Sequence, residues 1–367
     1  MRISLIGSGI IGAAHAARLD AMPRVTELLV ADFVDGRAEE LAGRLGKARA
    51  ITVEEAFDAA LDGVVVTAKT SRHAELLHRA LDARLPVFCE KPIALDLATT
   101  REVVAHAARV PEVPVQIGFQ RRFDAGYTRA KEAYASGRLG FVHTLRATTF
   151  DHRPPSAAYV PTSGGLFRDC SSHDFDAIRW LTGREAVSVY AVGSNRGEPY
   201  FGEHGDVDSG SCLVTYDDGM IAVVSASRNN GAGHDVRLEL HGSEGGRFVG
   251  LDDRAPLVTA EEDLSWRQKP PYLVYHERFE DAYVAELAHF LDVIESLDVI
   301  EGLDIVGGVD VVGSLDGTPS TACTPAEALE ALLLAEACVR SAATGAPVWL
   351  ADLRAEADAS GVPPQGA

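Results

Sequence analysis

Cysteine is scarce in this chain, and no two cysteines form a CxxC motif. Five occur among 367 residues, at positions 89, 170, 212, 323 and 338. An odd number of widely separated cysteines argues against a disulfide framework and against a cysteine-based zinc site. We therefore expect a reducing compartment, the cytoplasm, as the location of the protein.

Long apolar runs and excess positive charge are also missing. No run reaches the roughly 18 apolar residues that a membrane-spanning helix needs. Residues 2–6 form a strand-like segment rather than the apolar core of a secretion signal. The 34 Lys and Arg are outnumbered by 54 Asp and Glu, which gives a formal net charge of −20. Because this charge repels phosphate backbones and anionic lipids, we expect neither a nucleic acid nor a membrane as partner.

The composition that remains is that of a folded globular protein. Apolar residues make up 46% and charged residues 24% of the chain, which excludes a disordered or fibrous protein. At roughly 150 residues per domain, the length suggests about two domains.

The first 120 residues alternate short apolar runs with Ala-rich helical stretches. Such alternation predicts parallel βαβ units and hence a doubly wound α/β sheet. The expected strands are 2–7, 27–32, 62–68, 86–92 and 113–119, and the expected helices are 11–21, 36–46, 72–84 and 96–109.

From about residue 140 the strand candidates become longer and several are joined by turn signals, which is typical of an antiparallel sheet. They are 143–151, 187–194, 211–219, 220–229 and 234–245, accompanied by helices expected near 168–182, 278–296 and 325–344. We therefore place one domain at 1–121 and a second α/β domain, for substrate binding and oligomerisation, at 122–367. The acidic stretch 295–317 is either two short extra strands or a surface loop.

A glycine motif follows the first expected strand and opens a helix. Gly7, Gly9 and Gly12 form GxGxxG, in which glycines permit a tight turn and close approach of a pyrophosphate to a helix N-terminus. Asp32 closes the second strand 20 residues after Gly12, where a carboxylate can bind the adenosine ribose hydroxyls and repel a 2′-phosphate. The motif predicts a dinucleotide site that prefers NAD over NADP; the alternative is a glycine turn with an unrelated surface Asp.

A charged pair ends the strand at 86–92. Glu90 and Lys91 stand at the carboxyl end of a parallel strand, which is where open α/β sheets place their ligands. A Lys there can donate a hydrogen bond to a substrate hydroxyl and stabilise developing alkoxide charge. The alternative is a solvated Lys that pairs with a surface acid.

Asp169 and His173 stand four residues apart in a predicted helix, so we expect them on one face. A neutral His can accept an alcohol proton near pH 7, and a nearby Asp can orient it. The alternative is structural, with Asp169 as a helix cap and His173 merely buried. We interpret Asp174 and Asp176 as helix-start charges that favour the helix dipole.

Taken together, these motifs resemble a known family. The strings GSGIIG, VFCEKPIA, QIGFQRRFD, FRDCSSHDFDAIRWLTG and ELHGSEG are similar to the inositol 2-dehydrogenase branch of the Gfo/Idh/MocA oxidoreductases. The resemblance covers residues 1 to about 250 and returns at 324–350. It implies an N-terminal NAD-binding Rossmann domain and a C-terminal α/β domain with an open, mostly antiparallel sheet.

The resemblance also implies a site and a reaction. Lys91, Asp169 and His173 would form the catalytic group, with His173 as proton acceptor. A ring secondary alcohol would be oxidised to a ketone, with hydride passing to nicotinamide C4. The implied cofactor contacts are Gly7, Ser8, Gly9, Ile10, Ile11, Gly12, Asp32, Phe33, Ala68, His73, Glu90 and Lys91. The implied polyol contacts are Lys91, Gln120, Arg121, His152, Asp169, His173 and His234, and no metal is expected.

The chain departs from the family pattern at three places. Lys69 replaces a Pro after the third strand, the acidic insert is additional, and GAGH with Ala232 and His234 replaces a YGY-like string. The last change alters which substrate hydroxyls are bound, unless His234 is only a solvent-facing turn residue. Because relatives assemble through the open sheet face, we expect a homo-oligomer, a tetramer or a dimer.

Three other functions compete with a cyclitol dehydrogenase. One is an NAD(P)-dependent dehydrogenase of an aldose, an anhydrosugar or another sugar intermediate. Another is an NAD-dependent glycosidase, in which transient ring oxidation assists elimination. The third is a non-catalytic dinucleotide-sensing regulator, which would not need Lys91, Asp169 and His173 together.

Overall fold

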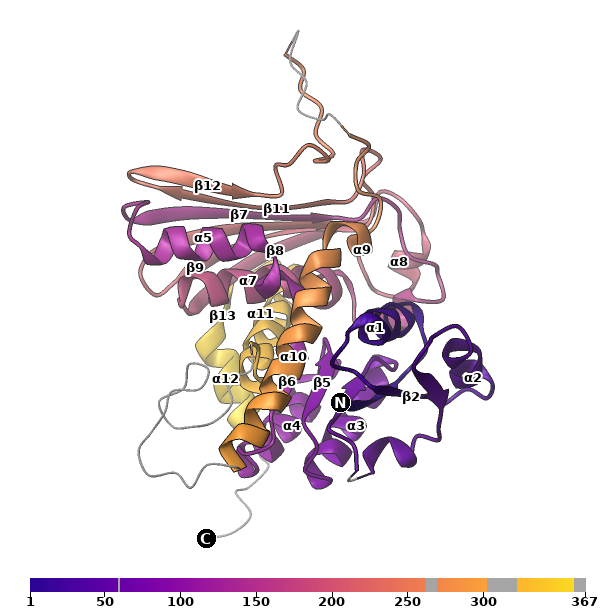
Figure 1. The fold of residues 1–367 in the computed structure, drawn as a ribbon. Coiled ribbons are helices and arrows are strands. Elements are labelled where there is room, and N and C mark those ends of the chain that lie inside the picture. The colour runs from indigo at the N-terminus through magenta and orange to yellow at the C-terminus, as the bar shows by residue number, and fades with distance from the viewer. Residues whose placement is uncertain (59, 262–268, 302–321, 360–367) are drawn as a thin grey trace. The chain divides into compact units, whose positions relative to one another are not determined.

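The computed structural model describes residues 1–58, 60–261, 269–301 and 322–359, and the chain divides into two compact units (Figure 1). Unit 1 comprises Met1–Gln120 and Tyr283–Leu329, and unit 2 comprises Arg121–Ala282 and Glu330–Ala367. A segment far along the chain, which the sequence-based division assigns to the second domain, thus packs with the first 120 residues.

Unit 1 is built on a six-stranded parallel sheet with strand order β3-β2-β1-β4-β5-β6. Its strands are β1 (Arg2–Ile6), β2 (Glu27–Ala31), β3 (Ala48–Ala50), β4 (Gly63–Val66), β5 (Val87–Glu90) and β6 (Val115–Gly118). Its N-terminal helices are α1 (Ile10–Ala21), α2 (Arg37–Ala42), α3 (Thr70–Asp82) and α4 (Leu97–Arg109). The predicted doubly wound sheet is confirmed, and β1 and β4 meet where the strand order reverses, which is the usual ligand crevice of this architecture.

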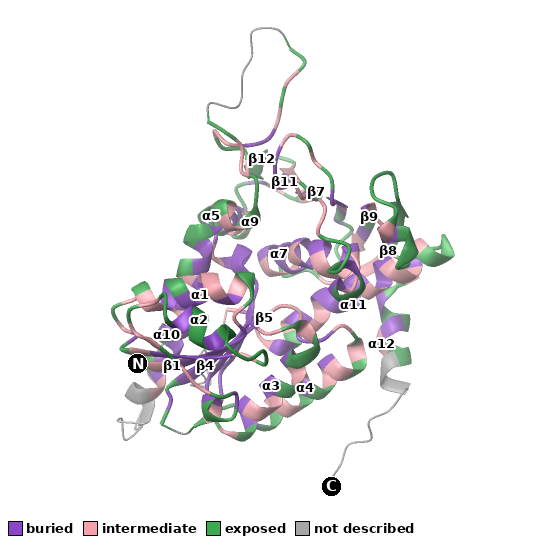
Figure 2. Ribbon diagram, turned by 90° about the vertical axis from the view of Figure 1, so that its right-hand side faces the viewer, coloured by how far each residue is buried: buried purple, intermediate pink, exposed green. Residues whose placement is uncertain are grey.

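The strands of unit 1 are apolar because helices cover both faces of a parallel sheet. Val64, Val65 and Val66 are fully buried, and Figure 2 shows β1, β4 and β5 as mostly buried. This packing fixes the carboxyl ends of the strands, which carry the candidate cofactor residues.

Helix α10 (Glu280–Glu301) contributes to the core of unit 1. Leu287 and Phe290 are fully buried in a cluster with Phe88, Ile3 and Leu5. Residues 295–301, expected as strand or acidic loop, are therefore the end of a helix, and that expectation is wrong for this part. The remainder of the acidic stretch, 302–317, lies outside the described residues.

Unit 2 is built on a seven-stranded sheet with order β12-β11-β7-β10-β9-β8-β13. The strands are β7 (Val142–Phe150), β8 (Ala186–Ser194), β9 (Ser209–Tyr216), β10 (Ile221–Ser227), β11 (Asp235–Gly242), β12 (Gly245–Val249) and β13 (Val348–Trp349). β7 and β10 pair in parallel, whereas the other neighbours are antiparallel. The predicted mostly antiparallel sheet is confirmed.

The helices of unit 2 include α5 and α7, which lie on one side of this sheet (Figure 1). The helices are α5 (Ala125–Ala135), α6 (Val160–Ser163), α7 (Ser172–Thr182), α8 (Tyr200–Glu203), α9 (Tyr275–Arg278), α11 (Pro325–Thr344, which begins in unit 1) and α12 (Leu350–Ala359). Tyr190 of β8 pairs with Leu213 of β9, and both side chains are exposed. Since paired residues share a sheet face, one face of unit 2 presents apolar side chains.

Among the described helices, none is both long enough and apolar enough to cross a lipid bilayer.

Candidate active site

The glycine turn after β1 has the geometry that a dinucleotide requires. Gly7 has a φ of +111°, and a Cβ there would lie 2.5 Å from the Ala68 nitrogen. A Cβ on Gly12 would lie 1.8 Å from the Gly7 oxygen, whereas one on Gly9 meets no described atom within 4 Å. Two of the glycines therefore permit close packing, and the third leaves open space beside the N-terminus of α1.

Ser8 lies in the same turn with a buried hydroxyl that has no hydrogen-bond partner among the described residues. Buried polar groups are normally paired, so this hydroxyl is a candidate ligand for a phosphate oxygen. Together with the open space at Gly9, it indicates that the turn suits the diphosphate of NAD. Ile10, at the start of α1, is strongly exposed.

Asp32 follows β2 and faces this turn. Its carboxylate accepts hydrogen bonds from the backbone N–H of Ser8 at 2.6 Å and of Val34 at 2.8 Å. Phe33 is exposed, and the guanidinium of Arg72 lies 4.8 Å from the centre of its ring. The carboxylate thus stands beside the turn, where it can bind ribose hydroxyls.

His73 of α3 joins the ends of two strands in unit 1. Its Nδ1 lies 2.8 Å from the Pro92 carbonyl oxygen and its Nε2 lies 2.9 Å from the Ala68 carbonyl oxygen. Burial lowers the pKa of His73, against the effect of these two carbonyls. The imidazole thus links the segment after β4 to the segment after β5, and direct contact of Ala68 and His73 with the cofactor stays a prediction. Lys69, one of the departures from the family pattern, is exposed just before α3.

Glu90 and Lys91 lie at the carboxyl end of β5, as predicted. The Glu90 Oε1 lies 2.7 Å from Nε2 of His15, whose side chain is fully buried in α1. The other His15 nitrogen, Nδ1, lies 3.3 Å from the Arg18 guanidinium. Sequence reasoning missed His15, although its position three residues after the last glycine of the turn places it on the helix that the motif opens.

In unit 2, Asp169 and His173 lie at a change of helix type. Residues Phe167–Ser171 form a π-helical turn, and α7 begins at Ser172. The expected single helix over 168–182 is thus two consecutive segments. Single π-helical turns are frequent at functional sites, and both Asp169 and His173 are half-buried.

A buried guanidinium links Asp169 to a second carboxylate. Arg228 NH2 donates to Asp169 Oδ2 at 2.7 Å, and Arg228 NH1 donates to Asp151 Oδ2 at 3.1 Å. Asp151 directly follows β7 and Arg228 directly follows β10. Because these two strands are parallel neighbours, their carboxyl ends meet at one sheet edge and bring the two residues together.

His234 belongs to the same cluster, so it is no solvent-facing turn residue. It is only 5% exposed, and its Nδ1 lies 3.5 Å from Asp151 Oδ1. Its Nε2 has no partner within the described part of the chain. The pKa of the Asp151 carboxyl is lowered: burial alone would raise this pKa, but the hydrogen bond from His234 and the charge of Arg228 outweigh burial. His152, also half-buried, has its Nδ1 3.2 Å from the Asn230 carbonyl oxygen.

Arg121 and Gln120 are buried. The Arg121 guanidinium forms an ion pair with Asp174 and donates to Thr149 Oγ1 at 2.8 Å. These contacts hold Arg121 in the interior of unit 2, and its contact with the polyol stays a prediction.

Asp174 and Asp176, interpreted as helix-start charges, are both buried in ion pairs. Asp174 pairs with Arg121, and Asp176 accepts two hydrogen bonds from Arg122 at 2.6 and 3.0 Å. All four side chains are buried. Burial raises the pKa of Asp174 in spite of the Arg121 charge. The two carboxylates therefore anchor α7 through buried ion pairs, and Asp174 lies in the first turn of α7, as expected.

The described residues contain no group of three or more His, Cys, Asp or Glu side chains that could hold a metal ion.

Known protein families match both parts of the chain. Residues 1–119 match an oxidoreductase family with an NAD-binding Rossmann fold, and residues 127–247 match the GFO/IDH/MocA C-terminal domain. The chain is 38% identical over 294 residues to myo-inositol dehydrogenase Hyg17 of Streptomyces leeuwenhoekii, which covers 79% of this chain and 87% of that protein. Fold and sequence define an NAD-dependent oxidoreductase of CH–OH groups. The chain belongs to the Gfo/Idh/MocA oxidoreductase family.

Solved structures agree with this assignment. A myo-inositol dehydrogenase from Corynebacterium glutamicum superposes with a TM-score of 0.81 at 31% identity, over 95% of this chain and 98% of that one. A scyllo-inositol dehydrogenase from Lactobacillus casei, solved with NAD(H) and scyllo-inositol, gives a TM-score of 0.78 at 26% identity, over 96% and 99%. The predicted family resemblance, fold class and NAD cofactor are confirmed.

Proposed function

We propose that the protein oxidises a ring secondary alcohol of an inositol-like cyclitol to the ketone. The observation that carries this proposal is the cluster of polar side chains after β7 and β10, where Asp151, Arg228, Asp169 and His234 lie together. A polyol presents several hydroxyls, and convergent carboxylates and imidazoles are the groups that bind them. The relatives whose names specify myo-inositol or scyllo-inositol support the same substrate class.

Each catalytic residue has a proposed role. When bound, NAD supplies the hydride acceptor, nicotinamide C4. His173 accepts the proton of the carbinol hydroxyl, so that the alcohol loses one hydride and one proton. Lys91 donates a hydrogen bond to the same oxygen and stabilises its developing negative charge. Asp169 orients the carbinol.

Three further residues complete the proposed polyol site. Gln120, His152 and His234 would contact hydroxyls away from the reacting carbon, and Glu90 would stand with Lys91 at the nicotinamide end. Binding away from the reacting carbon positions the carbinol for hydride transfer.

We also propose that the protein is a cytoplasmic homo-oligomer, a tetramer or a dimer. The exposed apolar side chains on one face of the unit 2 sheet, among them Tyr190, Val192, Leu213 and Phe248, support association through that face. Light scattering of the purified protein measures the mass of the particle, which shows whether it is a monomer, a dimer or a tetramer.

Formation of NADH across a panel of inositol epimers, aminocyclitols, aldoses and anhydrosugars tests the function. We expect reduction of NAD with one cyclitol and much weaker reduction with its epimers. Activity confined to aldoses or anhydrosugars would replace cyclitols as the substrate class. Release of a leaving group without net formation of NADH would indicate a glycosidase. No turnover of any compound in the panel, by a protein that binds NADH, would indicate a regulator.

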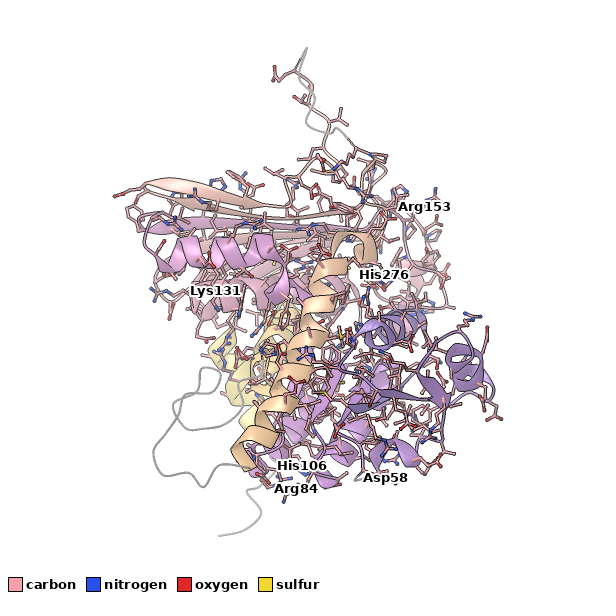
Figure 3. The ribbon with its side chains drawn as sticks, in the orientation of Figure 1. Asp58, Arg84, His106, Lys131, Arg153 and His276 are labelled. Atoms are coloured by element: carbon pink, nitrogen blue, oxygen red, sulfur yellow. The ribbon has the colours of Figure 1, made fainter. Side chains whose placement is uncertain are left out.

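Variants then test the catalytic roles. His173→Ala and Lys91→Ala should each lower kcat by roughly 10²-fold or more, the usual size of an acid–base contribution, with little change in NAD affinity. The matched controls are His204→Ala, an exposed residue, and Lys131→Ala. Lys131, labelled in Figure 3, belongs to α5, and its Nζ lies 4.1 Å from the centre of the Trp180 ring. Near wild-type turnover in either site variant would refute the role of that residue.

A further inference from the structure

Arg228 is an unusual residue for a protein interior. Arg228 is only 4% exposed. Burying a guanidinium costs free energy unless acceptors match its charge and its N–H donors. Two carboxylates from segments distant in the sequence match its charge and accept from both terminal nitrogens, whereas its Nε has no partner among the described residues. An arrangement this specific indicates a role beyond filling space.

The two terminal nitrogens of the Arg228 guanidinium bridge the carboxylates of Asp169 and Asp151. Each terminal nitrogen binds a different carboxylate, NH2 at 2.7 Å from Asp169 and NH1 at 3.1 Å from Asp151. A lysine ammonium is a single point charge and cannot reproduce this planar geometry. One side chain therefore bridges the two carboxylates.

The backbone of Arg228 is itself held in place. Its N–H donates to the Asp208 carbonyl oxygen at 2.7 Å. The Asp208 carboxylate in turn accepts the N–H groups of Arg196 and Gly197 at 2.8 and 2.6 Å. The guanidinium thus extends toward Asp169 from a backbone position that is itself hydrogen-bonded.

A tyrosine completes the environment of Asp169. The Tyr159 hydroxyl donates to the same oxygen, Oδ2, at 3.2 Å. Desolvation and the Asp169 carboxylate raise the pKa of Tyr159, so it stays a donor. The charged or titratable groups that face this carboxylate and its partner include Arg228, Tyr159 and His234. They also include Cys170, whose Sγ lies 3.8 Å from Asp151 Oδ2.

We propose that Arg228 is a positioning residue for the reaction, which keeps Asp169 ionised and oriented and couples it to the Asp151–His234 pair. The inference rests on the proposed role of Asp169 at the carbinol. Because a cation and a hydroxyl both donate to Oδ2, Asp169 serves as a hydrogen-bond acceptor. Proton acceptance is thereby left to His173, and the two groups are kept in different roles by their surroundings.

The pH dependence of Arg228→Met distinguishes positioning from simple structural support. Without the cation, Asp169 takes up a proton more readily, and a protonated Asp169 cannot accept from the carbinol. We expect kcat to fall roughly 10²-fold, as for other lost positioning contacts, and the acid limb of the kcat profile to move to higher pH. The KM for NAD should stay unchanged.

Three other variants make the result specific. Arg228→Lys keeps the charge and should keep the wild-type acid limb, with kcat lowered about 10-fold by loss of the bridge. Tyr159→Phe removes one donor but leaves the cation, so its acid limb should also stay in place. Arg237→Met, which removes a half-buried guanidinium paired with Asp235 on β11, should leave both kcat and the profile unchanged.

The outcomes are separable from those of the proposed function. A wild-type protein that oxidises no cyclitol or sugar refutes the proposed function itself. An active wild type with an Arg228→Met variant of similar kcat and unshifted acid limb overturns only the positioning role. If Arg228→Met does not fold, the kcat of Arg228→Lys tests the positioning role. A wild-type kcat in Arg228→Lys would show that the reaction does not need the bridge, and would overturn the role.

Discussion

The Asp32 carboxylate has a structural role and an expected cofactor-binding role. It holds the backbone N–H groups of Ser8 and Val34, and it stands where the ribose of NAD is expected. Its spacing from the glycine motif made it predictable from sequence. Its bond to Ser8 was not predictable, because that contact joins residues 24 apart in the chain. The contact between His15 and Glu90 was not predictable for the same reason, because the two residues are 75 positions apart.

We expect Asp32→Ala to lower the kcat/KM ratio of NAD to NADP by about 10-fold or more, because a negative charge that repels a 2′-phosphate is removed. The Arg72 guanidinium, 4.8 Å from the centre of the Phe33 ring, can then attract that phosphate. Steady-state kinetics with both cofactors measure the ratio.

A neighbouring carboxylate provides the control for this change. Asp35 is exposed and lies three positions further along the chain, so Asp35→Ala should leave the ratio unchanged. An equal loss with NAD and NADP in Asp32→Ala would mean that the residue supports the turn but does not select the cofactor.

Helix α10 shows what local sequence can and cannot predict at the scale of an element. Its apolar spacing predicted a helix, because a 3.6-residue period is a local property. Its partner was not predictable, because packing against β4 and β5 depends on contacts across some 200 residues. A Cβ on Gly63 of β4 would lie 2.8 Å from Ile294 Cδ1 and 3.2 Å from Phe290 Cζ, so a small residue is needed where the helix crosses the sheet.

Phe290→Ala should destabilise unit 1 by about 3–5 kcal/mol, the usual cost of removing a fully buried aromatic ring. The ring centre lies 6.1 Å from that of Phe88, and the cavity would open inside the core of the cofactor-binding unit. Chemical denaturation of the variant measures the loss, and bound NADH should offset part of it.

Another residue of the same helix is the control for Phe290. Val284 is 40% exposed, and Val284→Ala should change stability by less than about 0.5 kcal/mol. Similar small effects of both substitutions would contradict the packing of α10 in this core.

At the scale of the whole molecule, the fold class, the order of elements and the cofactor were predictable because each rests on a local motif or period. The ion pairs of Arg121, Arg122 and Arg228 were not, because charged residues are normally expected on the surface. Their partners come from other strands and helices, and only the assembled sheet brings them together. The polar interior of unit 2 is thus a property of the fold rather than of any segment.

The histidines of unit 1 give the molecule a defined response to acid. Burial lowers the pKa of His73, His78 and His289 from the usual value of 6.5. The charge of His106, which is labelled in Figure 3, also lowers the pKa of His78, and the two Nδ1 atoms lie 2.8 Å apart. Each of these three residues binds its proton more weakly in the folded protein than in the unfolded chain.

The free energy of unfolding should therefore be nearly constant above about pH 6.5 and decline below it, since the unfolded chain takes up more protons there. Each of the three histidines adds a slope of at most about 1.4 kcal/mol per pH unit. Urea denaturation between pH 8 and 5.5 measures the decline. In His78→Gln the slope should be shallower, because the difference in proton uptake between the unfolded and the folded chain is then smaller. A wild-type stability that stays flat down to pH 5.5 would mean that the buried imidazoles are protonated in the folded state as readily as in water.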